Sequence, residues 1–221
     1  MSSESGVEAL YPFLYEGRVD LDAVLAEVRR STAEKAREIV ALRGEVLRRE
    51  GDRIATCAAE MAQRFAAGGK LLAFGNGGSS SDAQDVATTL LHPAAGRSLP
   101  ALCLSNDVAV VTALSNDIGF EVVFARQIAA LGRPGDIAMG LSTSGNSENL
   151  VRAFDEAARR GLLTVGLAGY QGGRMAETDT IDYLFVVPSS SVHRIQEAQT
   201  TVFHVLCELA RAAVGEVAAG T

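Results

Sequence analysis

The sequence predicts an α/β fold, in which a mostly parallel sheet is flanked by helices. From Lys70 onward, five short apolar runs are separated by longer segments, mostly of helix length: "KLLAFG", "PALCLS", "DIAMGLS", "LLTVGLA" and "DYLFVV". The first four runs end in clusters of Gly, Ser, Asn or Asp. This alternation is typical of βαβ units, which place successive strands in parallel.

The segment before the first strand is predicted to be helical. Apolar residues recur at helical spacing over residues 21–50. Gly51 is expected to interrupt the helix, and a second helix is expected to run to about Ala67, where Gly68 and Gly69 end it.

The two ends of the chain are expected to differ. Residues 1–20 are predicted to be irregular, with Tyr11, Phe13 and Tyr15 packing on their own domain or on a neighbouring subunit. A final long helix is predicted from Arg194 to about Val214.

Charge and composition exclude several classes of protein. The formal net charge is −7, which argues against general binding to nucleic acid or anionic membranes, since both depend on a basic field. Arginines cluster between Arg29 and Arg64, but acidic residues alternate with them, so we expect ion pairs on a solvated helix face. The chain lacks an apolar run of membrane-spanning length and a signal-peptide pattern, which predicts a cytoplasmic location.

The three cysteines are Cys57, Cys103 and Cys207. They are far apart and form no CxxC pattern, so neither a disulfide framework nor a zinc knuckle is indicated. Each stands in an apolar run and is expected to be a small core residue.

Two loops carry the functional signal. "GNGGSSSDAQ" follows the first predicted strand, and "LSTSGNSENL", residues 141–150, follows the third; each opens a helix. Glycines let a backbone approach a ligand, and helix N-termini offer free N–H groups to an anion. A single loop of this kind is explained by ordinary helix capping, but two at neighbouring strand ends favour a phosphate monoester. Neither is a Walker A loop or a GxGxxG fingerprint, which argues against nucleotides.

The chain resembles the sugar isomerase (SIS) domain, and within it the phosphoheptose isomerase subfamily. "GNGGSS", "STSGNS" and "RIQE" carry the resemblance, together with "ALSNDIGFEVVFARQI" and "GYQGG", over roughly residues 20–215. It implies a SIS fold, a flavodoxin-like arrangement with a five-stranded parallel sheet and an N-terminal helical extension. The domains implied are an aromatic tail (1–20), N-terminal helices at an oligomer interface (21–67) and a sugar-phosphate-binding domain (68–221).

The resemblance also implies an activity, an assembly and a set of site residues. The activity is aldose–ketose isomerisation of sedoheptulose 7-phosphate or a related sugar phosphate. The assembly is a homotetramer with sites shared between subunits, without membrane or direct nucleic-acid contacts. His204 matches a histidine used as acid or base and as a zinc ligand. The implied substrate contacts are Asn76, Gly77, Gly78, Ser79, Asn116, Asp117, Ser142, Thr143, Ser144, Ser147 and Gln196.

The chain departs from the family at two positions. The family helix after the first loop carries a His and, four residues later, a Glu that is a metal ligand and the proton-transfer base. Asp85 and Thr89 hold these positions here, on one helix face. A threonine hydroxyl is not a base at neutral pH without a stronger partner. A catalytic zinc is disfavoured, because Asp85, Gln196 and His204 make a poor zinc set.

Three explanations therefore stay open. Asp85 has taken over as the base beside His204, or His193 supplies the base, or the protein binds a sugar phosphate without isomerising it, as a regulatory or protein-interaction module, for instance as a partner of the replication machinery. Asp82 is assigned to the first helical turn, where it favours the dipole, and His92 to the end of the same helix.

Overall fold

The computed structural model describes the backbone of residues 21–219 and the side chains of residues 22–215. The prediction for the aromatic tail, residues 1–20, falls outside the described residues. The chain divides into two units, residues 1–38 and residues 39–221, each taken separately below.

In the first unit, the described residues belong to helix α2 (Leu21–Ala66), which also continues into the second unit. Arg30 forms ion pairs with Glu27 and Glu34, at 2.7 and 3.2 Å. In the second unit Arg49 pairs with Glu45 at 2.6 Å. The predicted ion pairs along this arginine-rich stretch are confirmed.

Helix α2 continues through Gly51, so the predicted break there is wrong. A glycine inside a helix costs about 1 kcal/mol relative to alanine, whereas burying one Val or Ile side chain gains about 1.5–3 kcal/mol. Val46 and Ile54, on either side of Gly51, are both buried in the core. The helix ends at Ala66, one residue before the predicted end, and Gly68 follows it with a φ of +88° that suits glycine and an N–H that donates to the Phe65 carbonyl.

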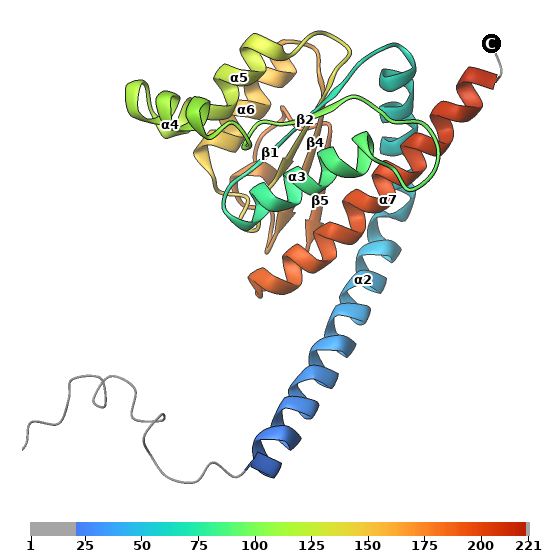
Figure 1. Cartoon of the computed structure of the whole chain (residues 1–221), viewed down its shortest axis with the longest axis vertical. Helices are drawn as coiled ribbons and strands as arrows, with labels where there is room; N and C mark the ends of the chain where they lie inside the picture. Colours follow the sequence, from blue (N-terminus) through green and yellow to red (C-terminus); the bar gives the residue numbers. More distant parts are fainter. Residues whose placement is uncertain (1–20, 220–221) are drawn as a thin grey trace, which may run out of the picture. The chain divides into compact units, whose positions relative to one another are not determined.

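The second unit is built on a five-stranded parallel sheet in the order β2-β1-β3-β4-β5 (Figure 1). Every neighbouring pair of strands is parallel. The five predicted strands are confirmed, as β1 (Leu71–Gly75), β2 (Ala101–Cys103), β3 (Ile137–Leu141), β4 (Leu163–Gly169) and β5 (Tyr183–Val187).

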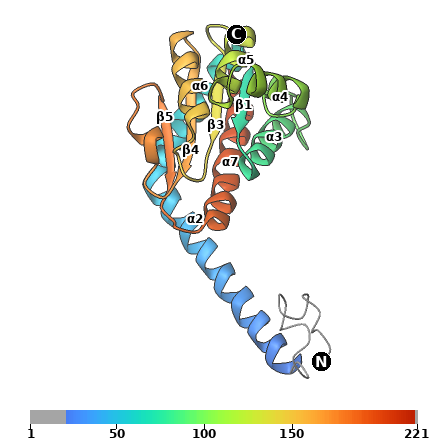
Figure 2. The same cartoon turned by 90° about the vertical axis from the view of Figure 1, so that its left-hand side faces the viewer.

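Helices connect the strands and cover both faces of the sheet (Figure 2). The helices of this unit after α2 are α3 (Gly78–Leu91), α4 (Val108–Asp117), α5 (Val123–Leu131), α6 (Glu148–Arg159) and α7 (Val192–Ala219), with short 3-10 turns η2 (Phe120–Val122) and η3 (Gly173–Ala176). The predicted C-terminal helix is α7, which begins two residues earlier and extends five residues further than predicted.

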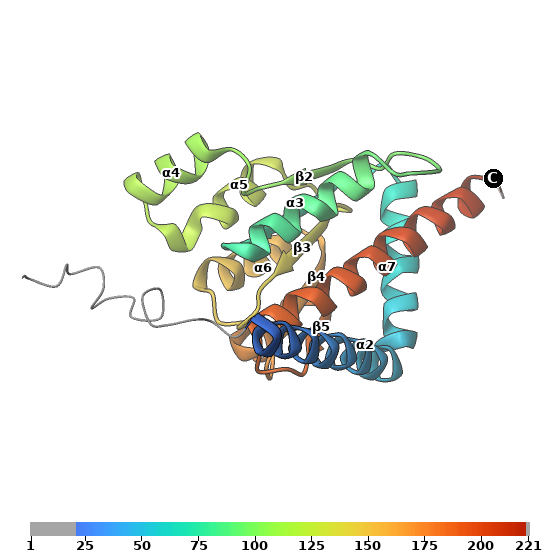
Figure 3. The same cartoon turned by 60° about the horizontal axis from the view of Figure 1, so that its bottom comes forward.

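Strand residues alternate between two cores. Leu71 and Ala73 of β1 pack with α3, α7 and the second half of α2. Leu72 and Phe74 pack on the other face with α5 and α6. This alternation follows from the two-residue period of a strand. Helices α3 and α7 lie side by side on one face of the sheet (Figures 1 and 3).

The cysteines lie where the sequence predicts. All three are free; Cys57 and Cys207 are buried, and Cys103 is partly buried against the core. Burial raises the pKa of the Cys57 and Cys207 thiols to about 12, so they stay protonated and unreactive.

No helix within residues 21–219 is both long enough and apolar enough to span a bilayer.

Candidate functional site

The two serine-rich loops meet at the switch point of the sheet. From β1 the chain passes to β2 on one side and then returns to β3 on the other, and ligands bind at this kind of reversal in open α/β sheets. A cavity of about 90 Å³ lies between the loops, and we call it the two-loop cavity. Its lining residues are Asn76, Ser79, Leu141, Ser142, Thr143, Ser144 and Ser147.

The size and chemistry of the two-loop cavity suit a phosphate group. One water molecule occupies about 30 Å³ in the liquid, so the cavity has room for a small anion and not for a whole sugar. Hydroxyl and amide side chains line it, together with one leucine. Helix α3 begins at Gly78, directly after Asn76 and Gly77, so the cavity lies at a helix N-terminus, the end that favours an anion.

Glycines are required where the loops approach other backbone. A Cβ on Gly75 would stand 2.4 Å from the Ser79 carbonyl oxygen, and a Cβ on Gly145 would stand 1.9 Å from that of Gly172. Gly145 also has a φ of +68°, which side chains rarely adopt. A larger residue at Gly75 or Gly145 would therefore displace the backbone that shapes the cavity.

A reciprocal amide pair joins the two loops. Asn76 donates to the side-chain oxygen of Asn149, and Asn149 donates back to Asn76, both at 2.9 Å. Asn149 is buried and stands near the start of α6. This contact, between residues 73 positions apart, fixes the first loop to the helix that follows the second.

The candidate acid–base residues lie along the contact between α3 and α7, which we call the α3–α7 seam (Asp82, Asp85, Thr89, Gln196 and His204). Asp85 Oδ2 and His204 Nε2 are 3.0 Å apart, a hydrogen-bonding distance. Both side chains stay partly exposed, at 47% and 41%. A substrate in the seam can therefore reach them.

The matched family model is that of the SIS domain, over residues 36–169. Phosphoheptose isomerase from Aquifex aeolicus is 47% identical over 151 residues, 67% of this chain and 78% of that one. The relative from Nitratidesulfovibrio vulgaris is 42% identical over 183 residues, 82% of this chain and 87% of its own. The solved phosphoheptose isomerase from Neisseria gonorrhoeae superposes with a TM-score of 0.76 at 35% identity, covering 84% of this chain and 99% of that one.

The chain belongs to the phosphoheptose isomerase family of SIS-domain proteins. The predicted family and fold are confirmed. The matched SIS region includes the two-loop cavity, Asp85 and Thr89, but it ends before Gln196 and His204 on α7.

Within this family member, Gln196 packs against the first turn of α3. A Cβ on Gly78 would stand 2.3 Å from Gln196 Nε2, so the glycine at 78 makes room for the amide. Gln196 and His204 thus both face α3, as their spacing on α7 predicts.

Asp82 has a different place from the one predicted. No acidic residue lies in the first turn of α3, and Asp82 follows that turn and hydrogen-bonds with Gln196. Its Oδ2 atom is buried without a hydrogen-bond partner. Burial raises the pKa of this carboxyl, the nearby Asp85 charge raises it further, and the Gln196 hydrogen bond opposes the shift.

Thr89 adds little to the seam as a proton-transfer group. Its hydroxyl is 3.5 Å from Asp85 Oδ1, at the limit of a hydrogen bond. Arg211, seven residues beyond His204 on α7, donates to the Thr89 carbonyl at 3.2 Å. The guanidinium thus holds the last turn of α3 and does not compete for Asp85.

The donor atoms of the seam do not fit the zinc site that the family resemblance implies. Asp85 and His204 face one another at hydrogen-bonding distance, and Gln196 is directed to Gly78 and Asp82. No group of three or more His, Cys, Asp or Glu side chains within residues 22–215 is arranged to hold a metal ion. Asp82 is bonded to Gln196, so the Asp85–His204 pair offers one carboxylate and one imidazole, fewer than the three protein ligands of a catalytic zinc.

Three other predicted residues lie apart from these two clusters. Asn116 and Asp117 are exposed at the end of α4, where the Asn116 amide donates to the Asp117 carboxylate at 2.8 Å. His193 is exposed in the first turn of α7. It is 11 residues before His204, or about 16 Å along the helix axis, so it is not part of the Asp85–His204 pair.

The loop after β4 supports the second serine-rich loop. A Cβ on Gly173 would stand 2.5 Å from the Ser144 carbonyl oxygen, and the Arg174 N–H donates to the Asn146 side chain at 3.0 Å. Tyr170, in this loop, has a φ of +54° and lines a notch of about 390 Å³ beside Ser144. The "GYQGG" stretch therefore shapes the outer wall of the second loop.

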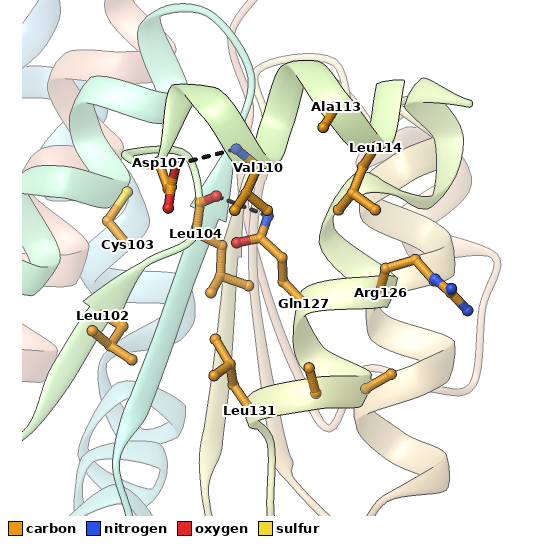
Figure 4. Close-up of a pocket in the computed structure, with 12 residues that line it drawn as sticks. Leu102, Cys103, Leu104, Asp107, Val110, Ala113, Leu114, Arg126, Gln127 and Leu131 are labelled. Atoms are coloured by element: carbon orange, nitrogen blue, oxygen red, sulfur yellow. Dashed lines mark hydrogen bonds between the residues drawn. The ribbon is translucent and has the colours of Figure 1, made fainter. Parts of the chain in front are cut away.

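A larger cavity, of about 830 Å³, lies between β2, α4 and α5 (Figure 4). Leucines at 102, 104, 114 and 131 dominate its lining, and Gln127 uses its amide to bond the carbonyl of Leu104 at 3.0 Å. None of the predicted site residues lines it. Its lining carries one cationic side chain, Arg126, but is otherwise mostly apolar and lacks the hydroxyl-rich loops that surround the two-loop cavity, so its size alone does not make it the functional site.

Sequence reasoning missed Asn149, Gln199 and the orientation of Asp82. Asn149 lies within "LSTSGNSENL" and Gln199 three residues after Gln196, so proximity to a motif was the available signal. Their partners, Asn76 and Ser142, are far away in the sequence.

Proposed function

We propose that the chain interconverts the ketose and aldose forms of sedoheptulose 7-phosphate, or of a closely related sugar phosphate, and that Asp85 and His204 transfer the protons. Family membership supports the reaction class. The two-loop cavity would hold the phosphate, and the α3–α7 seam would hold the reacting carbons.

The observation that carries this proposal is the Asp85–His204 contact at 3.0 Å. It brings together two groups able to exchange protons, a carboxylate on α3 and an imidazole on α7. Asp85 lies six residues beyond Ser79, or about 9 Å along α3 at a rise of about 1.5 Å per residue. A phosphate bound at Ser79 would leave the far end of a multi-carbon sugar beside the pair.

In the first half-reaction, Oδ1 of Asp85, the oxygen that does not contact His204, would remove the proton from C1 of the ketose. The C–H electron pair becomes the C1=C2 double bond of an enediol, and the carbonyl oxygen O2 takes a proton from protonated His204. A positioned acid–base pair of this type contributes about 10²–10⁴-fold to a rate.

In the second half-reaction, O1 would return its proton to His204 while the C1=O1 double bond of the aldose forms. The enediol electron pair then takes the proton from Asp85 at C2. Both residues end in their starting protonation states. Thr89 takes no proton in this scheme, because its hydroxyl is too weak a base.

We propose a homotetramer with shared sites as the assembly. Val40 and Leu47 of α2 are exposed at 68% and 67%, which is the kind of apolar surface that interfaces cover. Asn116 and Asp117 are exposed on α4, apart from the two-loop cavity, and would complete a site of a neighbouring subunit.

The alternative function is binding without turnover. It is favoured by one specific observation: Asp85 and Thr89 occupy the positions where the family pattern has its His and Glu. In that case the two-loop cavity would bind a sugar phosphate and the chain would act as a regulatory or protein-interaction module.

The test is to incubate the purified protein with sedoheptulose 7-phosphate in heavy water and to follow the proton NMR spectrum. New aldose signals, or deuterium entering next to the carbonyl, are the expected result. Melting temperature with and without the sugar phosphate reports binding in the same samples.

Two outcomes distinguish the functions. An unchanged spectrum with a raised melting temperature would reject isomerisation and support the binding module. Exchange that persists undiminished in Asp85→Asn would reject Asp85 as the base. Asp179→Asn, which changes an exposed carboxylate outside the site, is the matched control and should behave as the unmodified protein.

A further inference from the structure

Gln199 is a buried polar residue that the proposed reaction does not use. It lies on α7 and its side chain is fully buried, at 0% exposure. Its Nε2 donates to the backbone carbonyl of Ser142 at 2.8 Å, while its Oε1 has no hydrogen-bond partner. Buried amides are normally satisfied at both ends, so the one-sided contact requires an explanation.

The contact with Ser142 sets the orientation of the amide. Turning the amide over would place Oε1 against the Ser142 carbonyl oxygen, so that two acceptors would face one another. The amide therefore keeps Nε2 on the Ser142 carbonyl, and this orientation leaves Oε1 without a partner. An apolar side chain at 199 would avoid that oxygen but would leave the Ser142 carbonyl without this donor.

Ser142 is the first residue after β3, at the start of the second loop, and three contacts fix it. Its N–H donates to the Leu167 carbonyl at 2.9 Å, and its Oγ accepts the Gly145 N–H at 2.9 Å. The Gln199 amide supplies the third contact, at the carbonyl. Two of these three hydrogen bonds are made with β4 and with the loop itself, and the third, from Gln199, connects Ser142 to α7.

That tie connects the two parts of the site. Helix α7 also carries His204, five residues beyond Gln199, or about 7.5 Å along the axis. Because Ser142 lines the two-loop cavity, Gln199 fixes the cavity relative to the helix that carries the acid–base histidine. A sugar phosphate must span this separation to react.

We propose that Gln199 is a positioning residue that holds the second loop in its anion-binding shape and in register with His204. The proposal rests on the proposed function, since it assumes that the two-loop cavity binds the phosphate of the substrate. It assigns no contact between Gln199 and substrate.

The test is Gln199→Glu, which preserves the shape of the side chain and makes its donor titratable. An ionised carboxylate cannot donate to the Ser142 carbonyl, whereas a protonated carboxyl can. Burial favours the protonated form of a carboxyl, so protonation is accessible at mildly acidic pH. Affinity for sedoheptulose 7-phosphate should fall about tenfold at pH 8, as for loss of one buried hydrogen bond, and recover toward that of the unmodified protein at pH 6.

The matched control is Gln127→Glu. Gln127 is also a buried glutamine whose amide donates to carbonyls, those of Leu104 and Val123, but it lies on α5 away from the two-loop cavity. The same chemical change there should leave the affinity ratio between pH 8 and pH 6 unchanged. Gln199→Met is the second variant, and it should bind weakly at both pH values.

The probes are sedoheptulose 7-phosphate and inorganic phosphate, measured by calorimetry on the full chain. Binding by Gln199→Met as tight as that of the unmodified protein would overturn the positioning role. Equal affinity of Gln199→Glu and the unmodified protein would also overturn it, at a pH where an NMR titration shows the new carboxyl to be ionised. If the unmodified protein binds inorganic phosphate but not the sugar phosphate, the proposed reaction fails, and the same pH pattern measured with phosphate still decides the role of Gln199. Binding of neither probe overturns both proposals.

Discussion

The two-loop cavity lies at the carboxyl ends of β1 and β3 and the α3–α7 seam lies on one face of the same sheet, and the two regions relate differently to the family. The cavity keeps the pattern "GNGGSS" and "STSGNS", with glycines where backbone contacts demand them. The seam keeps Gln196 and His204 but has Asp85 and Thr89 in place of the family His and Glu. Under the proposed function, phosphate binding and proton transfer therefore belong to separate regions, and each is open to change by its own substitutions.

The largest expected effect is on kcat, and it distinguishes the α3–α7 seam from the two-loop cavity. Asp85→Asn removes the charge and the proton acceptor, and His204→Gln removes its partner, so each should lower kcat by about 10²–10⁴-fold. Binding of sedoheptulose 7-phosphate should change much less, because the phosphate contacts lie elsewhere. Steady-state kinetics and calorimetry check the two halves. A large loss of binding in Asp85→Asn would mean that the regions are not separable.

The next effect addresses the cavity. Gly145→Ala places a Cβ 1.9 Å from the Gly172 carbonyl oxygen at a φ of +68°. The second serine-rich loop and the loop after β4 must therefore move apart. We expect a loss of about 2–4 kcal/mol in the free energy of unfolding and loss of phosphate binding. Urea unfolding measures the first quantity.

Gly77→Ala is the matched control for that change. Gly77 has a similar φ of +55°, but nothing lies within 4 Å of the added Cβ. The cost should be that of the backbone conformation alone (φ +55°, ψ −124°), about 1–3 kcal/mol and smaller than at Gly145. Equal losses of unfolding free energy in the two variants would show that the close approach of Gly145 to Gly172 does not contribute to stability.

A gain of function is the third expectation. Thr89→Glu adds a carboxylate one turn beyond Asp85, on the same face of α3, where the family pattern has its base. Turnover should rise about tenfold if the geometry of the seam still accepts that base. An unaltered or reduced rate, with the melting temperature preserved, would show that Asp85 and His204 have been rearranged around the smaller side chain.

The smallest effect concerns stability and pH. The pKa of Asp82 is raised by burial and by Asp85, so the folded protein holds this proton to higher pH than the unfolded chain does. Folding is then penalised at pH values above the raised pKa, and the penalty disappears as the pH falls below the ordinary value. Asp82→Asn should therefore raise the melting temperature at pH 7.5, by an amount that shrinks at lower pH. Asp179→Asn, an exposed carboxylate, is the control. A gap that grows on acidification would contradict this sign.

Much of the fold could be predicted because its signals are local. Each strand is a short apolar run before a small-residue loop, and the burial of both sheet faces makes these runs continuous. The error at Gly51 arose because a helix-breaking preference of about 1 kcal/mol is local, whereas the packing of Val46 and Ile54 that outweighs it is not.

The candidate site was predictable in its residue types and only partly in its contacts. The serines and Asn76 lie around one cavity, as two similar loops at adjacent strand ends predict. Asp82 was misplaced because helix-dipole reasoning takes account of position along a helix and not of the neighbouring helix, which here supplies Gln196.

The sequence by itself determined the order of strands and helices, the two serine-rich loops at neighbouring strand ends, the family, and the substitution of Asp85 and Thr89 for the family's His and Glu. Only the tertiary structure decided which side chains meet: Asp85 with His204 across 119 positions, and Gln199 with Ser142 across 57. The physical reason is that periodicity and turn chemistry act over a few residues, whereas the crossing of α3 and α7 depends on how both helices pack against the sheet.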